Sequence, residues 1–157
     1  MDRCTLCWQK DGSCEDCREA ASKAKYGFKP IRNIKTGIPP QAPIKVYLAI
    51  PYTWNPKKSF EIANKVAADL MNKGYIVFSP ISHSHPIADY LAPELRTDSN
   101  WWLVQDFSFI EHWADEVHVI CIGENGLDLI ENSTGVTGEW KKSIQCTKPI
   151  KIIEYYE

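Results

Sequence analysis

The chain has 157 residues, of which 44% are apolar and 24% charged, and its formal net charge at pH 7 is −2. The length and composition favour one globular domain with a sizeable core and a short appendage. The slightly negative net charge means that no overall positive field would attract nucleic acid or an anionic membrane. No apolar run reaches the roughly 18 residues of a membrane span, and the N-terminus does not resemble a signal peptide, so we expect a cytoplasmic protein without a membrane partner.

The first predicted element is a cysteine cluster within residues 1–20. Four of the six cysteines form two CxxC pairs, namely Cys4 with Cys7 and Cys14 with Cys17. In a chain that is not secreted, this spacing favours a tetrahedral metal site over disulfides. We predict a knuckle with structural Zn²⁺, whose binding would supply the folding energy of so short a segment; an iron–sulfur site and redox thiols are the alternatives. Its role, whether partner docking, weak nucleic-acid binding or anchoring of the N-terminus, stays open.

Residues 21–43 form the second predicted segment. They are basic, rich in glycine and proline, and lack a sustained hydrophobic period. Such a composition is typical of a linker. From Ile44 onward, strand-like and helix-like patterns alternate without an internal repeat, so we assign residues 44–157 to an α/β domain.

This domain contains four short apolar runs typical of buried strands and three longer segments with helical spacing. The strands are predicted at residues 44–50, 75–79, 116–122 and 149–156, and the helices at residues 55–74, 101–116 and 139–146. The stretch 79–100 contains three prolines and several turn formers, so we expect a loop there.

Such alternation predicts right-handed βαβ units and a flavodoxin- or Rossmann-like parallel sheet of four to five strands, with helices on both faces. In these sheets, ligands bind beyond the carboxyl ends of the strands. The segments after the first three strands, residues 49–56, 79–86 and 123–139, should therefore open on the same edge.

The segment ENSTGVTGEWKKS, residues 131–143, contains a candidate nucleophile, Glu139. If a helix begins near residues 136–138, Glu139 lies in its first turn, where unpaired amides and the dipole favour an ionised carboxylate. Ser133 and the amides around Gly135 would then hold a phosphate or a sugar hydroxyl. The alternative is a capping box, in which a Ser or Thr caps the helix and Glu139 returns the hydrogen bond.

Two further candidates lie in predicted regular elements. Asp106 is surrounded by aromatic and aliphatic residues in WWLVQDFSFIEHW. Such an environment raises a carboxyl pKa and suits a general acid, whereas the alternative is a solvent-facing residue on an amphipathic helix. Tyr47, in the first strand, is either an ordinary core residue or one whose hydroxyl reaches the ligand edge.

The loops beside the first two strands supply candidate substrate contacts. His83 and His85 in SHSHP could contact substrate, bind a metal with Asp89 as a third ligand, or only shape the loop. Pro51 and Tyr52 follow the first strand and are predicted to contact the substrate. Four aromatic side chains could also form a wall on which a base stacks: Tyr52, Trp54, Trp101 and Trp102.

Taken together, these segments resemble the nucleoside 2-deoxyribosyltransferase-like superfamily. The likeness rests on VYLAIPYT, GYIVFSPISHSHPIA, WLVQD, ADEVHVICI and STGVTGEWKKS, and it covers about residues 44–153. It is strongest toward a small bacterial and phage branch that carries the SPI-HSHPIA signature and has had no assigned function. The superfamily also includes nucleoside 5'-monophosphate N-glycosidases.

The resemblance implies a mechanism. In the superfamily, a glutamate of the last active-site helix, matched here by Glu139, attacks the anomeric carbon and forms a glycosyl-enzyme intermediate. An aspartate, matched by Asp106, assists protonation of the base or orients the sugar, and a first-strand tyrosine, matched by Tyr47, holds the nucleophile. The resemblance further implies that catalysis uses no metal or redox cofactor and that a homodimer or higher oligomer completes the site.

Two departures from the superfamily's patterns concern the phosphate. Ser133 stands where transferases tend to carry an aspartate and where monophosphate hydrolases have a serine near the phosphate, which favours a nucleotide. The segment AIPYTW lacks the Gly-Ser-Ile-Arg-Gly phosphate loop of the hydroxymethyl-dUMP hydrolases, and this absence argues against a nucleotide substrate. The base, the sugar, the phosphate and the choice between hydrolysis and transfer stay open.

The leading prediction is therefore an enzyme that hydrolyses or transfers the N-glycosidic bond of a nucleoside or nucleoside 5'-monophosphate. The alternative is a nucleotide-binding or sequestering protein of the same fold without turnover. A third hypothesis is a zinc-anchored interaction protein whose pocket is incidental. The three hypotheses predict different effects of removing the carboxyl group of Glu139, because only an enzyme has base release to lose.

Overall fold

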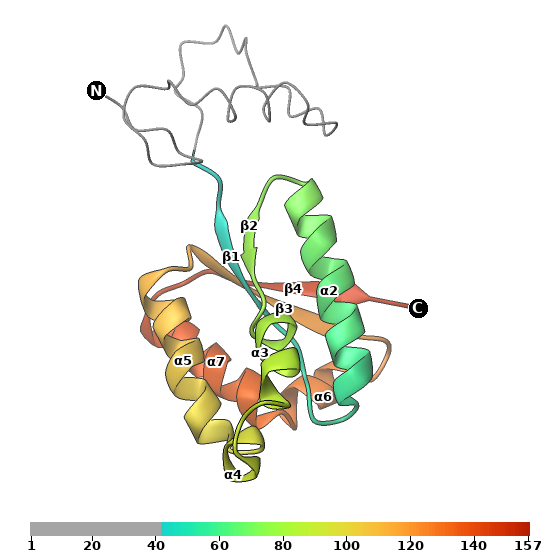
Figure 1. The fold of residues 1–157 in the computed structure, drawn as a ribbon. Helices are drawn as coiled ribbons and strands as arrows, with labels where there is room; N and C mark the ends of the chain where they lie inside the picture. The colour runs from blue at the N-terminus through green and yellow to red at the C-terminus, as the bar shows by residue number, and fades with distance from the viewer. Residues whose placement is uncertain (1–41) are drawn as a thin grey trace, which may run out of the picture. The chain divides into compact units, whose positions relative to one another are not determined.

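The computed structural model describes residues 42–157 (Figure 1). The predicted zinc ligands Cys4, Cys7, Cys14 and Cys17 lie outside the described residues, as does nearly all of the predicted linker. None of the helices between residues 42 and 157 combines the length and the apolar character that a membrane crossing requires.

A four-stranded parallel sheet forms the centre of the described part. Its strands are β1 (Lys45–Ala49), β2 (Ile76–Phe78), β3 (Glu116–Ile122) and β4 (Ile150–Tyr155). They are arranged in the order β2-β1-β3-β4, and every neighbouring pair is parallel. The predicted α/β fold with a parallel sheet is confirmed, and each strand lies within a residue or two of its predicted position.

Within residues 42–157, six helices connect and cover the strands: α2 (Pro56–Asn72), α3 (Pro80–Ala88), α4 (Pro93–Arg96), α5 (Ser99–His112), α6 (Gly126–Glu131) and α7 (Thr134–Gln145). The start of α2 follows the sequence signals, since the Asn55 side chain caps it and Pro56 occupies its first position. After α2, Gly74 adopts a φ of +92°, a left-handed conformation that glycine tolerates well.

The sheet has an apolar cluster on each face. Val46 and Leu48 of β1 belong to the cluster that includes Ile62 of α2. Tyr47 belongs to the other cluster, which includes Val136 of α7 and residues of α5 and α6. Successive side chains of a strand point to opposite faces, so helices cover both faces, and Figure 1 shows α2 on one side of the sheet and the pair α5 and α7 on the other. Tyr47 is thereby directed from the central strand toward α7.

The predicted loop at residues 79–100 is wrong, because this stretch contains α3 and α4. Ser79 caps α3, and its hydroxyl accepts a hydrogen bond from the Ser82 amide at 3.3 Å. Pro80 and Pro93 occupy the first positions of their helices, where a backbone N–H is not needed. Two of the three prolines therefore begin helices instead of preventing them.

The segment 123–139 also contains more helix than predicted. It includes the short helix α6, and α7 begins at Thr134 instead of near residues 136–138. The physical reason is Ser133, whose side chain caps α7 by accepting a hydrogen bond from the Val136 amide. This earlier start changes the position of Glu139 within the helix.

Candidate active site

A cavity of about 330 Å³ opens beyond the carboxyl ends of β1 and β2. Its lining includes Ile50 and Tyr52 after β1, Pro80 after β2, and residues of the segment that follows β3. The three segments expected to open on one edge of the sheet therefore do meet there, as the parallel topology requires.

Three helices each present one face to this cavity. The residues repeat at the three- and four-residue spacing of a helix face: Ile81, Ser84, His85 and Ala88 on α3; Ser99, Trp102, Leu103 and Asp106 on α5; Gly135, Val136 and Glu139 on α7. The helix faces thus bring together side chains that are widely separated in the sequence.

Glu139 is a buried carboxyl group at the wall of the cavity, with 5% of its surface exposed. The Tyr47 hydroxyl donates a hydrogen bond to its Oε1 atom at 2.6 Å. Tyr47 is fully buried and comes from the central strand, so a core residue fixes the position of this carboxyl group. Tyr47 is thus a core residue, as one of its two readings had it; it does not itself line the cavity, but its hydroxyl contacts Glu139, which does.

The position of Glu139 in α7 corrects two expectations. Because α7 begins at Thr134, Glu139 lies in the second turn, beyond the amides expected to hold it ionised. The capping-box reading is also wrong, since Ser133 caps the helix while the side chain of Glu139 pairs with Tyr47. Burial, not the helix start, sets the environment of this carboxyl group.

Asp106 lines the same cavity from α5 and is also buried, so the solvent-facing reading is wrong. Its Oδ1 atom has no hydrogen-bond partner among the described residues. The neighbouring helix can approach because Gly138 lacks a side chain: a Cβ there would lie 3.2 Å from Leu103 Cδ1. Gly138 thus lets α7 lie close to α5, which brings Glu139 and Asp106 to one site.

The shared environment changes the acidity of all three groups. Burial raises the pKa of Asp106 to about 7. Burial, followed by the negative charge of Asp106, raises the pKa of Glu139 to about 8, while the hydrogen bond from Tyr47 acts in the opposite direction. Burial and the two carboxyl groups also raise the pKa of the Tyr47 hydroxyl, which therefore remains a donor. Near neutral pH, the two acids titrate as a pair.

The substrate contacts predicted in the segment after β3 line the cavity. Ser133 caps α7, and Thr134 and Gly135 follow it at the cavity wall. The first amides of a helix lack partners within the helix. This end of the cavity therefore presents polar backbone groups, whereas its remainder is lined by apolar residues such as Ile50 and Ile81 together with polar ones such as Ser84 and Arg96.

The other predicted contacts divide into two groups. Tyr52 and His85 line the cavity, and the Tyr52 hydroxyl lies 2.7 Å from His85 Nδ1. His83 is exposed, packs beside Phe78 and does not line the cavity. Pro51 is buried, and its carbonyl oxygen accepts hydrogen bonds from Ser59 and Trp54 instead of facing the cavity. Of the proposed aromatic wall, Tyr52 and Trp102 line the cavity.

Several lining residues escaped the sequence reasoning, among them Ser84 and Arg96. Ser84 lies between the two histidines of SHSHP, and its buried hydroxyl has no partner among the described residues. The helical spacing of Ile81, Ser84 and His85 is the signal that would have identified it, had the segment been interpreted as a helix. Arg96 is held at the cavity by hydrogen bonds to the carbonyl oxygens of Leu91 and Asp89.

Metal ligation involving His83, His85 and Asp89 has no geometric support. Across residues 42–157, no three His, Cys, Asp or Glu side chains gather closely enough to hold a metal ion. The imidazole of His85 is instead engaged by Tyr52. The described site therefore presents carboxyl, hydroxyl, imidazole, guanidinium and backbone amide groups around one cavity.

Comparisons with known proteins find a matching family and a similar solved structure. Residues 44–155 match the family described as "Domain of unknown function (DUF1937)", and no curated protein matches. The chain is similar to the solved structure of a 2-deoxyribosyltransferase from the psychrotolerant bacterium Bacillus psychrosaccharolyticus, with 27% sequence identity, coverage of 70% of this chain and 72% of that chain, and a TM-score of 0.47. The family match covers nearly the same residues as the resemblance indicated by the sequence motifs, which extends over about residues 44–153.

Proposed function

We propose that the chain, which belongs to the DUF1937 family, is an enzyme that cleaves or transfers the N-glycosidic bond of a nucleoside or nucleoside 5'-monophosphate. One observation carries this proposal: a buried carboxyl group, Glu139, receives a short hydrogen bond from Tyr47 at the wall of a cavity that also contains Asp106. Most enzymes that break a glycosidic bond use a pair of carboxyl groups, in different environments, on either side of that bond.

The proposed step begins with Glu139 in its ionised form. A carboxylate oxygen forms a bond to the anomeric carbon while the bond from that carbon to the base nitrogen breaks, and the electron pair of the broken bond leaves with the base. Positive charge develops on the sugar in the transition state, and the adjacent anion stabilises it. Water or an acceptor base then displaces the carboxylate, which gives hydrolysis or transfer.

Asp106 and Tyr47 have supporting roles in this step. In the free protein Asp106, with a pKa of about 7, ionises before Glu139, whose pKa is about 8, so the reactive form in this proposal is the one in which the remaining proton has moved from Glu139 to Asp106. The hydrogen bond from Tyr47 and the developing positive charge both favour the anion on Glu139. Asp106 would then hold the proton that assists the departing base, or orient a sugar hydroxyl.

The cavity suits a nucleoside in size and lining. A volume of about 330 Å³ lies at the lower end of the range for small-ligand sites. Apolar side chains such as Trp102 and Leu103 would cover the flat base, and the polar start of α7 at Ser133 and Gly135 would face sugar hydroxyls or a phosphate. Arg96 offers a cation for a phosphate at the same cavity.

The test is base release from a panel of the deoxyribonucleosides, ribonucleosides and their 5'-monophosphates, measured by chromatography. We expect free base from at least one compound, and a glycosyl adduct on the protein by intact mass when turnover is slow. If no compound releases base and no adduct forms, the enzymatic function is wrong. A rise in melting temperature with the same panel would then favour the sequestering protein.

A Tyr47→Phe substitution should lower kcat by about tenfold to a hundredfold with little change in KM, because it removes a hydrogen bond that stabilises the anion of Glu139. The same loss raises the pKa of Glu139, so the acidic limb of the pH–rate profile should move to higher pH. The measurement is a pH series of kcat for both proteins. Tyr75→Phe, outside the cavity lining, is the control, and an unmoved acidic limb in Tyr47→Phe would contradict the role of Tyr47.

A further inference from the structure

We propose that His85 donates a hydrogen bond to the base of the substrate and that Tyr52 positions it for this contact, an inference that rests on the proposed function and deepens it. His85 belongs to the cavity-facing side of α3, together with Ile81 and Ser84. Its side chain is neither a general acid nor a nucleophile in this proposal. It recognises the base, which is the leaving group of the proposed reaction.

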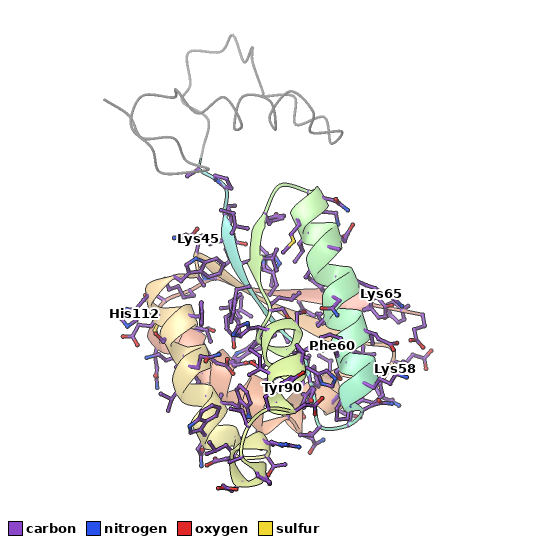
Figure 2. The ribbon with its side chains drawn as sticks, in the orientation of Figure 1. Lys45, Lys58, Phe60, Lys65, Tyr90 and His112 are labelled. Atoms are coloured by element: carbon purple, nitrogen blue, oxygen red, sulfur yellow. The ribbon has the colours of Figure 1, made fainter. Side chains whose placement is uncertain are left out.

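Two contacts fix the imidazole ring before any substrate binds. The Tyr52 hydroxyl lies 2.7 Å from Nδ1. The ring also stacks on Phe60 of α2, with ring centroids 4.5 Å apart and an angle of 23° between the planes. Figure 2 shows Phe60 on the side of α2 that faces α3. The position and the plane of the imidazole are thus both determined, which is the preorganisation that a recognition group requires.

The hydrogen bond with Tyr52 is compatible with either tautomer of His85, and we take the Tyr52 hydroxyl as its donor. Burial and the charge of Asp89 raise the pKa of the Tyr52 hydroxyl, so it keeps its proton. When this hydroxyl donates to Nδ1, the neutral imidazole carries its hydrogen on Nε2. Among residues 42–157, no acceptor pairs with Nε2. An acceptor atom of a bound base would satisfy it.

The positions of α3 and α7 indicate that His85 meets the base instead of the sugar. Ile81 of α3 packs against the apolar cluster on the α2 face of the sheet, whereas Val136 of α7 belongs to the cluster on the opposite face. His85 and Glu139 therefore reach the cavity from elements on opposite faces of the sheet. In a displacement at the anomeric carbon, the nucleophile and the leaving group also lie on opposite sides of that carbon. In this arrangement His85 meets the edge of the base, while Trp102 and Leu103 of α5 cover its flat face.

Ser84 strengthens the assignment of the α3 wall to the base. Its hydroxyl is buried, lines the cavity and has no partner within the described part of the chain. Buried polar groups without partners are uncommon in native proteins, and a base offers both donors and acceptors along its edge. As the glycosidic bond breaks, electron density moves onto the base, so a donor at its edge is bound more strongly in the transition state.

The experiment compares three variants at these positions on the nucleoside and 5'-monophosphate panel. His85→Phe keeps an aromatic ring for stacking on Phe60 but removes the donor, and kcat/KM should fall about tenfold to a hundredfold. His85→Gln should recover part of this loss, because its amide nitrogen can occupy the place of Nε2. His112→Phe replaces an exposed histidine of α5 and should leave kcat/KM unchanged.

A double-mutant cycle tests the positioning role of Tyr52. Tyr52→Phe alone should lower kcat/KM by about threefold to tenfold, and the double variant with His85→Phe should be no worse than His85→Phe alone, since Tyr52 acts through His85. Independent, multiplying losses would overturn the positioning role. All variants are first shown to unfold at similar denaturant concentrations.

The outcomes separate this inference from the proposed function. If the wild-type protein releases base and His85→Phe does so equally well, the contact between His85 and the base is wrong while the function stands. Equal losses in His85→Gln and His85→Phe would also overturn it, because the donor would then be irrelevant. If the wild-type protein releases no base from any compound, the function fails and the His85 contact fails with it.

Discussion

Glu139→Gln is expected to reduce base release by about 10³-fold or more, with the substrate still bound. The amide has nearly the shape of the carboxyl group and can accept the hydrogen bond from Tyr47, but it supplies neither a nucleophile nor a negative charge at the anomeric carbon. The measurement is single-turnover base release, with ligand binding followed by calorimetry on the same preparation. Loss of kcat with an unchanged Kd is the expected pattern.

Glu131→Gln is the matched control for this substitution. It makes the same chemical change at an exposed position on α6, outside the cavity lining, and should retain full activity. Retained activity in Glu139→Gln would contradict the assignment of the nucleophile. Loss of binding in that variant would show that Glu139 acts by holding the substrate.

Glu139→Gln should also stabilise the folded protein, and increasingly so as the pH rises. In the unfolded chain, the carboxyl group of Glu139 loses its proton near the usual pKa of 4.5, whereas in the folded protein it keeps the proton up to a pKa of about 8. Between these values the folded state binds more protons than the unfolded state, so the stability of the wild type falls as the pH rises. Glutamine does not ionise and avoids this loss.

The free energy of unfolding of Glu139→Gln should therefore match that of the wild type near pH 4.5 and exceed it by about 2–4 kcal/mol near pH 8. Denaturant unfolding at a series of pH values measures this difference. Glu131→Gln, at an exposed site, should show little change at any pH. A difference between Glu139→Gln and the wild type that does not vary with pH would contradict the raised pKa.

The strands and α2 could be predicted from the sequence because local patterns determine them. The four apolar runs are short and bounded, and the start of α2 carries an Asn cap and a proline at its first position. Helix α3 was missed for a reason that is also local. Pro80, Pro86 and Pro93 suggest a broken chain, and only the position of each proline relative to a helix start distinguishes a breaker from a first residue.

The site was partly predictable, and the unpredicted part depends on tertiary packing. Motif position identified Glu139, Asp106 and Tyr47 as candidates, and the described structure brings them to one place. The sequence offered a raised pKa for Asp106 and a core position for Tyr47 as readings, but it placed Glu139 in a first helical turn that keeps it ionised; the burial of Glu139 could not be inferred, because it depends on which helix face meets the cavity. His83 and His85 look equivalent in the sequence, yet a helix directs residues two apart in different directions, and only His85 lines the cavity.

The hydrogen bond between Tyr47 and Glu139 also has a consequence for the order in which the site forms during translation. It joins residues 92 positions apart, from the first strand to the last helix of the domain. During translation, the central strand and Asp106 emerge long before α7, so the cavity is completed only when almost the whole domain has left the ribosome. A nascent chain that can already form most of the sheet therefore still lacks the carboxyl group of Glu139. The proposed activity could therefore begin only after α7 has emerged and folded against the rest of the domain.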